Sequence, residues 1–304
     1  MATRTSFPPR RTFRSRFLRN RAAAVGGALI LVAVVLSLIG PALYQSLLPA
    51  EQHPLRDPVH QDYDAINATP SATHWLGADD LGRDNFTRLL DAIRVSLTVA
   101  LVVEGINIGL GGLLGLLAGY LGGVFDMLIS RVADMLFAFP GLLLAILVSA
   151  IFGATARELY GDMGRLLLVA GALSLVSWPL MARFVRGQAL ALKSRDFITA
   201  ARSIGDTSAR VMFRHILPNV AWLIIVAATL DVASVIVSEA TLSLLGLGIE
   251  EPGASLGLLI ARSVGRIERY PLQIFFPAAA ITLLVLSFSF LGDGLRDALD
   301  PTNV

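Results

Sequence analysis

The sequence predicts an all-α membrane protein with six spanning helices. The chain is 55% hydrophobic, only 16% of its residues are charged, and six long apolar stretches divide it. A soluble domain carries about 25% charged residues, so this chain lacks the polar residues to cover a water-exposed surface. It has no cysteine, which excludes disulfides, thiolate nucleophiles and cysteine-ligated metals.

The chain starts with a basic tail, residues 1–21, which contains seven arginines and no acid. The apolar stretch of residues 22–44 follows it. A signal-peptide core has about 7–15 apolar residues and ends at a cleavage site of small residues. Because this stretch is longer and shows no such site, we expect an uncleaved spanning helix, for which about 20 residues suffice.

A polar loop, residues 45–94, separates the first span from the second. Between residues 45 and 93 it carries eight acids and three arginines. Residues 95–304 hold the other five spans. We expect these at residues 95–121, 124–152, 164–185, 220–242 and 272–291.

The charge distribution predicts how the spans are oriented. The arginine-rich tail places the N-terminus in the cytoplasm. Six crossings then place the acidic loop outside the cell and return the C-terminus to the cytoplasm. Residues 186–219 also fall inside, and they carry six basic residues against two acids, so two separate charge counts predict one topology.

Four glycines in and just after the second span are spaced by four residues. They are Gly111, Gly115, Gly119 and Gly123. On a helix they share one face and allow a neighbouring helix to approach closely. We therefore expect tight helix packing along this face.

Residues 196–219, DFITAARSIGDTSARVMFRHILPN, predict two short helices. Each has apolar residues at i, i+3, i+4 and i+7. These are Phe197, Ala200, Ala201 and Ile204 in the first helix, then Ala209, Met212, Phe213 and Ile216 in the second. Gly205 suits a left-handed position after the first helix, and Asp206 suits the N-cap of the second.

This helix pair presents an alanine-rich surface and a cationic face. One alternative is an amphipathic helix lying on lipid headgroups, which requires bulky Trp, Phe or Leu anchors. Alanine gives little grip on lipid but allows a close fit into a protein groove. We therefore interpret the segment as a docking surface for another protein.

The same stretch resembles the cytoplasmic EAA loop of ABC-importer permeases. That signature has Glu-Ala-Ala, a Gly four residues later and a Leu-Pro further on. Ala200, Ala201, Gly205 and the pair Leu217-Pro218 match it in register, while Thr199 stands where the signature has Glu. The sequence RHILPN is close to the form found in the dipeptide/oligopeptide/nickel permease family.

Three further stretches resemble the C-type subunit of that family. They are HWLGADDLGRDNFTRLLDAIRVSL (residues 74–97), LSLLGLG (residues 242–248) with Glu239 ahead of it, and LGDGLRDALDP (residues 291–301). Residues 253–260 depart from the Trp-containing pattern of the family. The resemblance covers the chain from residue 22 and implies a type I ABC importer permease fold, with a permease core at residues 95–304 and a coupling loop at residues 186–219.

The resemblance implies a pore-forming subunit of an ATP-driven importer, with di- or oligopeptides as the expected substrate and nickel or glutathione as alternatives. The implied partners are a B-type permease, two ABC ATPase subunits, an extracytoplasmic solute-binding protein and the bacterial inner membrane, with no nucleic acid. The coupling loop is implied to dock the ATPase subunit. Its docking residues are Asp196, Thr199, Ala200, Ala201, Arg202, Gly205, Arg210, Arg214, Leu217 and Pro218.

The chain shows no nucleotide-binding motif of its own. A P-loop needs Gly-Lys followed by Ser or Thr, but the single lysine, Lys193, follows Leu192. We therefore expect no catalytic residue and no bound cofactor in this chain. ATP and Mg²⁺ would belong to the ATPase subunits.

Three acids fall in or near the spans: Glu104, Asp231 and Glu239. A charge at the bilayer centre costs about 2.5–3.5 kcal/mol on insertion scales, so each should face the bundle or a wet path. Either they line the translocation path or they bond neighbouring helices. Glu239 also matches the family. Arg131 and Asp134 stand three residues apart and are expected to form a structural pair.

The polar loop contains two candidate metal clusters, one of acids and one of histidines. They are Asp79, Asp80 and Asp84, and His53, His60 and His74. Their spacing lacks the regular arrangement of metal loops. We expect no metal site and interpret Asp84 as an acid near the start of a helix.

Two rival function classes stay open at this point. A secondary transporter driven by an ion gradient predicts inverted repeats or broken helices around a central ion site. The sequence shows neither, although Asp231 keeps this alternative open. An assembly or anchoring protein without a transport role is the third interpretation.

Overall fold

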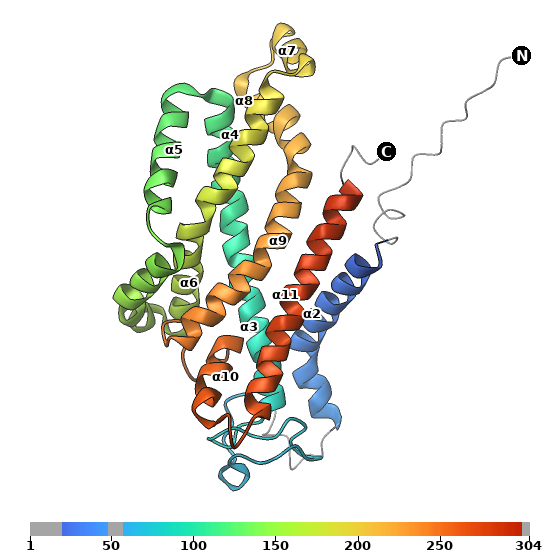
Figure 1. The fold of residues 1–304 in the computed structure, drawn as a ribbon, viewed down its shortest axis with the longest axis vertical. Helices are drawn as coiled ribbons and strands as arrows, with labels where there is room; N and C mark the ends of the chain where they lie inside the picture. Colours follow the sequence, from blue (N-terminus) through green and yellow to red (C-terminus); the bar gives the residue numbers. More distant parts are fainter. Residues whose placement is uncertain (1–19, 48–56, 300–304) are drawn as a thin grey trace, which may run out of the picture.

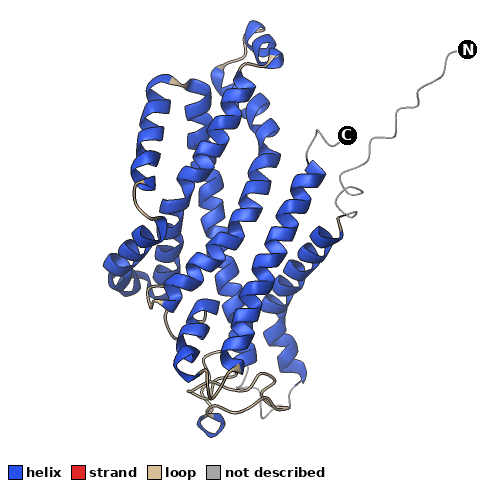
Figure 2. Ribbon diagram, viewed as in Figure 1, coloured by secondary structure: helices blue, strands red, loops and turns tan. Residues whose placement is uncertain are grey.

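The computed structural model describes residues 20–47 and 57–299. Throughout these ranges the chain forms helices and loops, with no strand (Figure 2). Most of the basic tail, His53 and the last five residues lie outside them. The principal helices are α2 (Arg21–Leu47), α3 (Asn85–Ile106), α4 (Gly112–Leu121), α5 (Gly123–Phe137), α6 (Gly141–Lys193), α7 (Asp196–Ser203), α9 (Leu217–Leu244), α10 (Leu256–Ser263) and α11 (Leu272–Leu299).

Short helical turns link several of these helices. They are η2 (Tyr63–Ala65), η3 (Asn107–Gly111), α8 (Ser208–Arg210), η4 (Val211–Ile216) and η5 (Val264–Arg266). Because η3 joins α3 to α4, and α8 and η4 lead into α9, two longer continuous helices result. They cover Asn85–Leu121 and Ser208–Leu244.

Five helices in the described ranges are long and apolar enough to cross a membrane. They are Arg21–Tyr44, Asn85–Leu121, Gly141–Lys193, Ser208–Leu244 and Leu272–Leu299. The all-α polytopic architecture is therefore confirmed. The long loop lies between the first two of these helices, as the sequence predicts.

The expected third span, residues 124–152, is not one helix. α5 ends at Phe137 and α6 begins at Gly141, with Pro140 at its N-cap. Proline lacks an N–H group and disfavours helical geometry in the residue before it, so the helix breaks here. At 15 residues α5 is too short to span a bilayer alone.

α6 has two arms that meet at Gly161. This glycine has φ 59° and ψ −142°, backbone angles that residues other than glycine rarely adopt. Because the chain bends at this kink, the 53 residues of α6 do not form one straight helix. The expected fourth span, residues 164–185, lies in the second arm. Where the sequence predicts six spans, the described residues therefore form five helices long and apolar enough to cross a membrane.

The helices form a bundle with distinct ends (Figure 1). α7 projects from one end, whereas α10 and the loop before α3 lie at the other end. α11 packs between α2 and α9, and α4 packs along α6. A buried apolar core joins α3, α6, α9, α10 and α11. The segment expected in the cytoplasm and the loop expected outside thus lie at opposite ends of the bundle.

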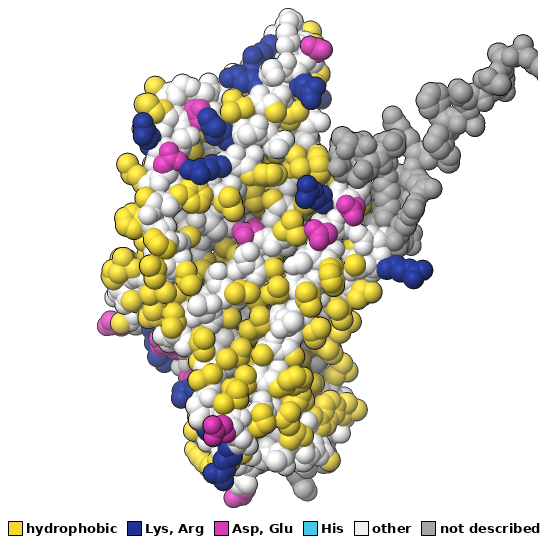
Figure 3. All heavy atoms as spheres, viewed as in Figure 1, with side chains coloured by type: hydrophobic (Ala, Val, Ile, Leu, Met, Phe, Trp, Pro, Cys, Tyr) yellow, Lys and Arg dark blue, Asp and Glu magenta, His cyan; other side chains and the backbone are white. Residues whose placement is uncertain are grey.

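The surface fits a membrane environment. In Figure 3 hydrophobic side chains cover most of the middle of the visible face, and most Lys and Arg lie toward its two ends. Many large apolar side chains are exposed, including Leu31, Leu38, Leu101 and Leu143. Such a belt is unfavourable in water and is suited to lipid or to partner helices.

The glycine stripe confirms close packing of α3–η3–α4 against α6. A Cβ at Gly111 would lie 2.7 Å from the carbonyl oxygen of Trp178, and one at Gly119 would lie 2.6 Å from that of Arg186. Gly115 faces the backbone of Ala182 in the same way. Gly123 differs: it has φ 57° and opens α5, and a Cβ added there would meet no atom within 4 Å.

Candidate functional site

The coupling segment, residues 196–217, forms the predicted pair of short helices. α7 ends at Ser203, and Gly205 follows with φ 93°, which confirms its left-handed position. Thr207, not Asp206, caps the next helix: its hydroxyl oxygen accepts from the backbone N–H of Arg210 at 3.3 Å. The predicted cap was wrong because Asp206 is used elsewhere.

The Asp206 carboxylate ties the turn to the second helix. It accepts from Nε2 of His215 at 2.9 Å and from Nη1 of Arg210 at 3.1 Å. These two hydrogen bonds lower the pKa of Asp206 below its ordinary value, since they favour the ionised form. The turn between the two helices is therefore held by side chains as well as by the backbone.

One face of the coupling segment is buried in the bundle. Ile198, Val211, Met212 and Ile216 pack into an apolar cluster with residues of α4, α6 and α9. Sequence periodicity missed Ile198, because an eight-residue helix offers more than one apolar stripe. Its spacing of three from Ala201 was the available signal, and Ala201 is buried as well.

The opposite face of the segment is open. Ile204 is 83% exposed, and Phe197 and Phe213 are also exposed. Arg210 and Arg214 stand exposed on the same segment, so the open face combines apolar and cationic groups.

The residues expected to dock a partner divide between these two faces. Asp196, Thr199, Ala200, Arg202, Gly205, Arg210, Arg214 and Pro218 are exposed. Ala201 is buried and Leu217 is half-buried. Arg202 makes a cation–π contact: its guanidinium group lies 5.1 Å from the ring centre of Tyr120 at the end of α4.

Two of the three intramembrane acids come together. The carboxyl groups of Glu104 on α3 and Asp231 on α9 lie within hydrogen-bonding reach of each other. Asn107 donates to Oε1 of Glu104 at 3.2 Å, and Ser177 of α6 donates to Asn107 Oδ1 at 2.9 Å. A polar group from each of three helices thus meets in the middle of the bundle.

Asp231 opens onto two cavities. The larger has a volume of about 360 Å³ and is otherwise lined by Leu180, Met181, Phe184, Ala227, Leu230 and Ser234. The smaller has a volume of about 90 Å³ and shares Asp231 and Ser234 with the first. Asp231 thus gives the acid pair access to a sizeable space between α6 and α9.

Glu239 lies apart from both cavities. It is fully buried and accepts from Ser96 of α3 at 2.9 Å and from Ser243 at 2.7 Å. Ser255, at the start of α10, donates in turn toward Ser243 at 3.1 Å. Glu239 therefore joins α3, α9 and α10.

Comparison with known proteins decides between the classes left open by the sequence. Residues 111–303 match the family described as "Binding-protein-dependent transport system inner membrane component". Residues 9–70 match the "N-terminal TM domain of oligopeptide transport permease C". The chain belongs to this permease family. It is a C-type membrane subunit of a binding-protein-dependent importer, and a secondary transporter or a mere anchor is no longer a competing interpretation.

Three curated relatives show how closely this permease follows the family. It is 40% identical to the glutathione transport system permease protein GsiD of Pectobacterium atrosepticum, over 96% of this chain and 91% of the relative. It is 37% identical to the dipeptide permease DppC of Alkalihalophilus pseudofirmus, over 98% and 91%. It is 34% identical to the oligopeptide permease OppC of Bacillus subtilis, over 94% and 87%.

A solved structure supports the fold. The permease resembles a chain in the inward-facing MetNI methionine ABC transporter, with a TM-score of 0.55 and 19% identity. The match covers 70% of this chain and 96% of the other. At this identity it shows the permease fold alone.

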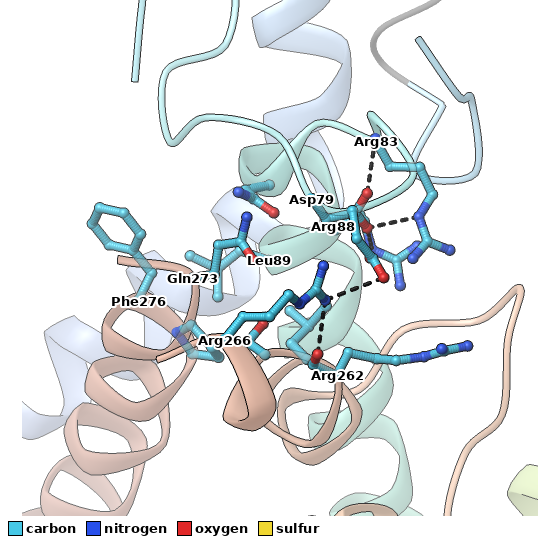
Figure 4. A pocket seen from close by; sticks show the side chains of 13 residues that line it. Asp79, Arg83, Arg88, Leu89, Arg262, Arg266, Gln273 and Phe276 are labelled. Atoms are coloured by element: carbon cyan, nitrogen blue, oxygen red, sulfur yellow. Dashed lines mark hydrogen bonds and ion pairs between the residues drawn. The ribbon is translucent and has the colours of Figure 1, made fainter. Parts of the chain in front are cut away.

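At the loop end of the permease, ion pairs join the loop before α3 to the segment around α10. Arg83 bonds Asp79 at 2.7 Å and Glu251 at 2.8 Å, and Arg262 bonds Glu251 at 2.7 Å. Arg266 reaches Asp80 at 3.2 Å. Figure 4 shows these arginines gathered around one small cavity together with the buried Arg88.

The ion pairs shift the titration of their members. Burial alone would raise the pKa of Glu251, but the hydrogen bond and charge of Arg83 outweigh it and hold that pKa below its ordinary value. Burial likewise works to lower the pKa of Arg83, but Glu251 and Asp79 outweigh it and raise that pKa. Both groups are therefore held in their charged forms at neutral pH.

The acids Asp79, Asp80 and Asp84 and the histidine His74 have structural partners. Asp84 caps α3, as expected, by accepting from the N–H of Thr87 at 2.9 Å, and it also lies 3.1 Å from Nδ1 of His74. In the part of the chain that is described, no group of three His, Cys, Asp or Glu side chains is placed to hold a metal. The expected pairing of Asp134 with Arg131 was wrong, because Asp134 pairs with Arg183 across helices.

Proposed function

We propose that this permease imports di- or oligopeptides across a bacterial inner membrane. Its partners are a B-type permease, two ABC ATPase subunits and an extracytoplasmic solute-binding protein. The relatives named above are permeases for a dipeptide, an oligopeptide and glutathione, which supports a peptide substrate. The coupling segment and both termini face the cytoplasm, in keeping with the arginine-rich tail.

One observation carries the proposal: the coupling segment has an inner face buried in the bundle and an outer face left open. Ile198 and Ile216 fix it to α4, α6 and α9. Ile204 and Phe213 stand exposed on its other side. Exposed apolar groups rimmed by polar ones mark protein contact sites. An ATPase subunit docked there could move the bundle through the buried side.

The ATP chemistry belongs to the partners. The ammonium group of the single lysine, Lys193, lies 5.7 Å from the ring centre of Tyr120, where it makes a cation–π contact. ATP and Mg²⁺ therefore bind the ATPase subunits, and closure of those subunits moves the coupling segment. The bundle then changes from inward-facing to outward-facing, and the binding protein releases the substrate into the cavity.

Glu104 and Asp231 line the translocation path in this proposal. Asp231 lines both cavities between α6 and α9, and Glu104 of α3 lies beside it. Glu239 instead holds helices together, since its oxygens are occupied by Ser96 and Ser243.

A docking experiment tests the proposal. The tagged permease is purified from cells that also produce its partner permease and ATPase subunits, and the bound ATPase subunit is quantified for wild type and Ile204→Glu. We expect the substitution to reduce bound ATPase about tenfold or more. Ile267→Glu is the matched control, because Ile267 is a half-exposed isoleucine at the opposite end of the bundle.

Transport completes the test. In proteoliposomes the wild-type complex should take up a tripeptide only when ATP is present on the ATPase side and the binding protein is present on the other. Equal ATPase binding by Ile204→Glu and Ile267→Glu would overturn the docking role. Uptake by this chain alone, driven by a proton gradient, would overturn the proposed function.

A further inference from the structure

The pair formed by Glu104 and Asp231 lacks a positive partner. In the described part of the chain no cation contributes to the environment of either carboxyl group. Other buried acids differ. Asp79 is paired with Arg83, and Glu239 accepts from two hydroxyl groups. Glu239 has no cation either, but each of its carboxyl oxygens accepts a hydrogen bond, whereas one carboxyl oxygen of Glu104 does not.

One oxygen of the pair has no amide or hydroxyl donor. The Glu104 residue is only 4% exposed, and Asn107 donates to its Oε1. Its Oε2 is buried and accepts no hydrogen bond from an amide or hydroxyl group. A buried acceptor left without a donor is unfavourable, and more so when it is charged. The site therefore favours a ligand that brings donors and positive charge.

Electrostatics points the same way. Two ionised carboxylates in contact repel each other, and the low dielectric constant of a protein interior strengthens this repulsion. A cation between them turns this repulsion into two attractions. A primary ammonium group suits the place well, because it is compact and carries three N–H donors.

The adjoining space indicates what the ammonium group is attached to. The cavity of about 360 Å³ next to Asp231 has walls of Leu180, Met181, Phe184 and Leu230. Pockets for small organic ligands begin at about 300 Å³ and are mostly apolar with a few placed polar groups. This combination fits an amine on an apolar body. A divalent metal ion fits less well, since it prefers six or more oxygen ligands or their waters.

We propose that Glu104 and Asp231 bind the free amino group of the peptide as it crosses the membrane. This inference rests on the proposed function of peptide import. The amino terminus is common to peptides of every sequence, and the apolar wall accepts varied side chains. The pair thus recognises the class of substrate, not one particular peptide.

Paired ligands test the inference. The complete complex is purified with its native partner permease and ATPases, placed in lipid nanodiscs without nucleotide, and titrated with a tripeptide that carries a fluorophore at its C-terminus. The second ligand is the same peptide with an acetylated amino group. We expect the free-amine peptide to bind the wild type about tenfold tighter or more than its acetylated twin.

Substitutions at Glu104 and Asp231 test whether these two residues cause the preference for the free-amine peptide. The double variant Glu104→Gln with Asp231→Asn should bind the two ligands equally. The conservative Asp231→Glu should keep the preference. The matched control, Asp134→Asn with Glu158→Gln, removes the same two kinds of carboxyl group from exposed positions on α5 and α6 and should also keep it. Retention of the ATPase subunits and the thermal stability of each complex show whether a variant is assembled.

The outcomes separate the inference from the proposed function. Equal binding of both ligands by the wild type, no binding of either, or a preference that survives in the assembled double variant would overturn the inference. In those cases the two acids share a proton instead. If ATP-driven peptide uptake persists in proteoliposomes, the proposed function stands without the inference. If no peptide is taken up, the proposed function itself fails.

Discussion

Ile198 and Ile204 lie six residues apart on the coupling segment, yet one is fully buried and the other is 83% exposed. At 100° per residue, a separation of six places two side chains on different faces of a helix. Ile198 belongs to the apolar cluster that includes α4, α6 and α9. The segment is therefore fixed to the bundle on one side and exposed on the other, which is what the proposed docking role requires.

Gly205 gives the coupling segment its turn. Its φ of 93° is unfavourable for other residues, so Gly205→Ala should destabilise the segment by about 1–2 kcal/mol. Peptide-stimulated ATP hydrolysis should fall with it. The control, Gly187→Ala, lies in open space within α6 and should stabilise by about 0.5–1 kcal/mol. Thermal unfolding and ATPase assays of the purified complexes measure both; equal behaviour of the two variants would contradict the assigned role.

Gly115 sets the approach of α4 to α6. A methyl group there would meet the backbone of Ala182, which cannot move aside as a flexible side chain can. We expect Gly115→Ala to destabilise the permease by about 1–3 kcal/mol. Gly109→Ala is the matched control, since no atom lies within 4 Å of the position its methyl group would occupy. A melting temperature lowered equally in both variants would refute this packing.

Glu239 should behave as a structural residue. Glu239→Ala removes the acceptor for Ser96 and Ser243 and should destabilise the complex by about 1–3 kcal/mol for each group left unpaired. Glu239→Gln keeps one acceptor and should lose less. Peptide affinity should stay unchanged in the assembled Gln variant. A lower affinity at unaltered thermal stability would instead place Glu239 on the translocation path.

The ion pairs around Glu251 predict a pH dependence. The folded state lowers the pKa of Glu251 below its ordinary value of 4.5, so its stabilising contribution is complete above that pH and is lost as the pH falls through the lowered value. Wild type should therefore be more thermostable than Glu251→Gln at pH 7, and the difference should shrink as the pH is lowered below about 4.5. A difference that stays constant or grows on acidification would contradict the ion-pair account.

Local sequence signals were enough for much of the fold. Long apolar runs located the spanning helices, and the glycine spacing at Gly111, Gly115 and Gly119 located a helix contact. The left-handed turn at Gly205 was also predictable, because few residues other than glycine fit there. These features depend on residues close together in the chain.

The prolines show a feature that the local sequence does not predict, namely whether a helix continues through a proline or ends before it. Pro179 and Pro277 lie inside helices that continue through them, whereas a helix ends just before Pro140. All three stand in apolar stretches, so the surrounding packing decides whether the helix continues. The third span was misjudged for this reason.

Contacts between distant segments were equally hidden. Glu104 and Asp231 meet from α3 and α9, and Arg83 meets Glu251 although 168 residues separate them in the chain. The sequence identified each intramembrane acid as costly in a membrane. Only the three-dimensional arrangement showed that two of these acids share a site, while Glu239 is occupied by hydroxyl groups.

Photo-cross-linking from residue 204 tests the central claim most directly. The chain has no cysteine, so Ile204→Cys gives it a single site for a benzophenone maleimide, which is attached in membranes that contain the whole transporter. The account predicts a cross-link to the ATPase subunit from position 204 and none from Ile267→Cys at the other end. Labelling of position 204 by a membrane-impermeant maleimide added outside intact cells, or no ATPase adduct from it, would contradict the account.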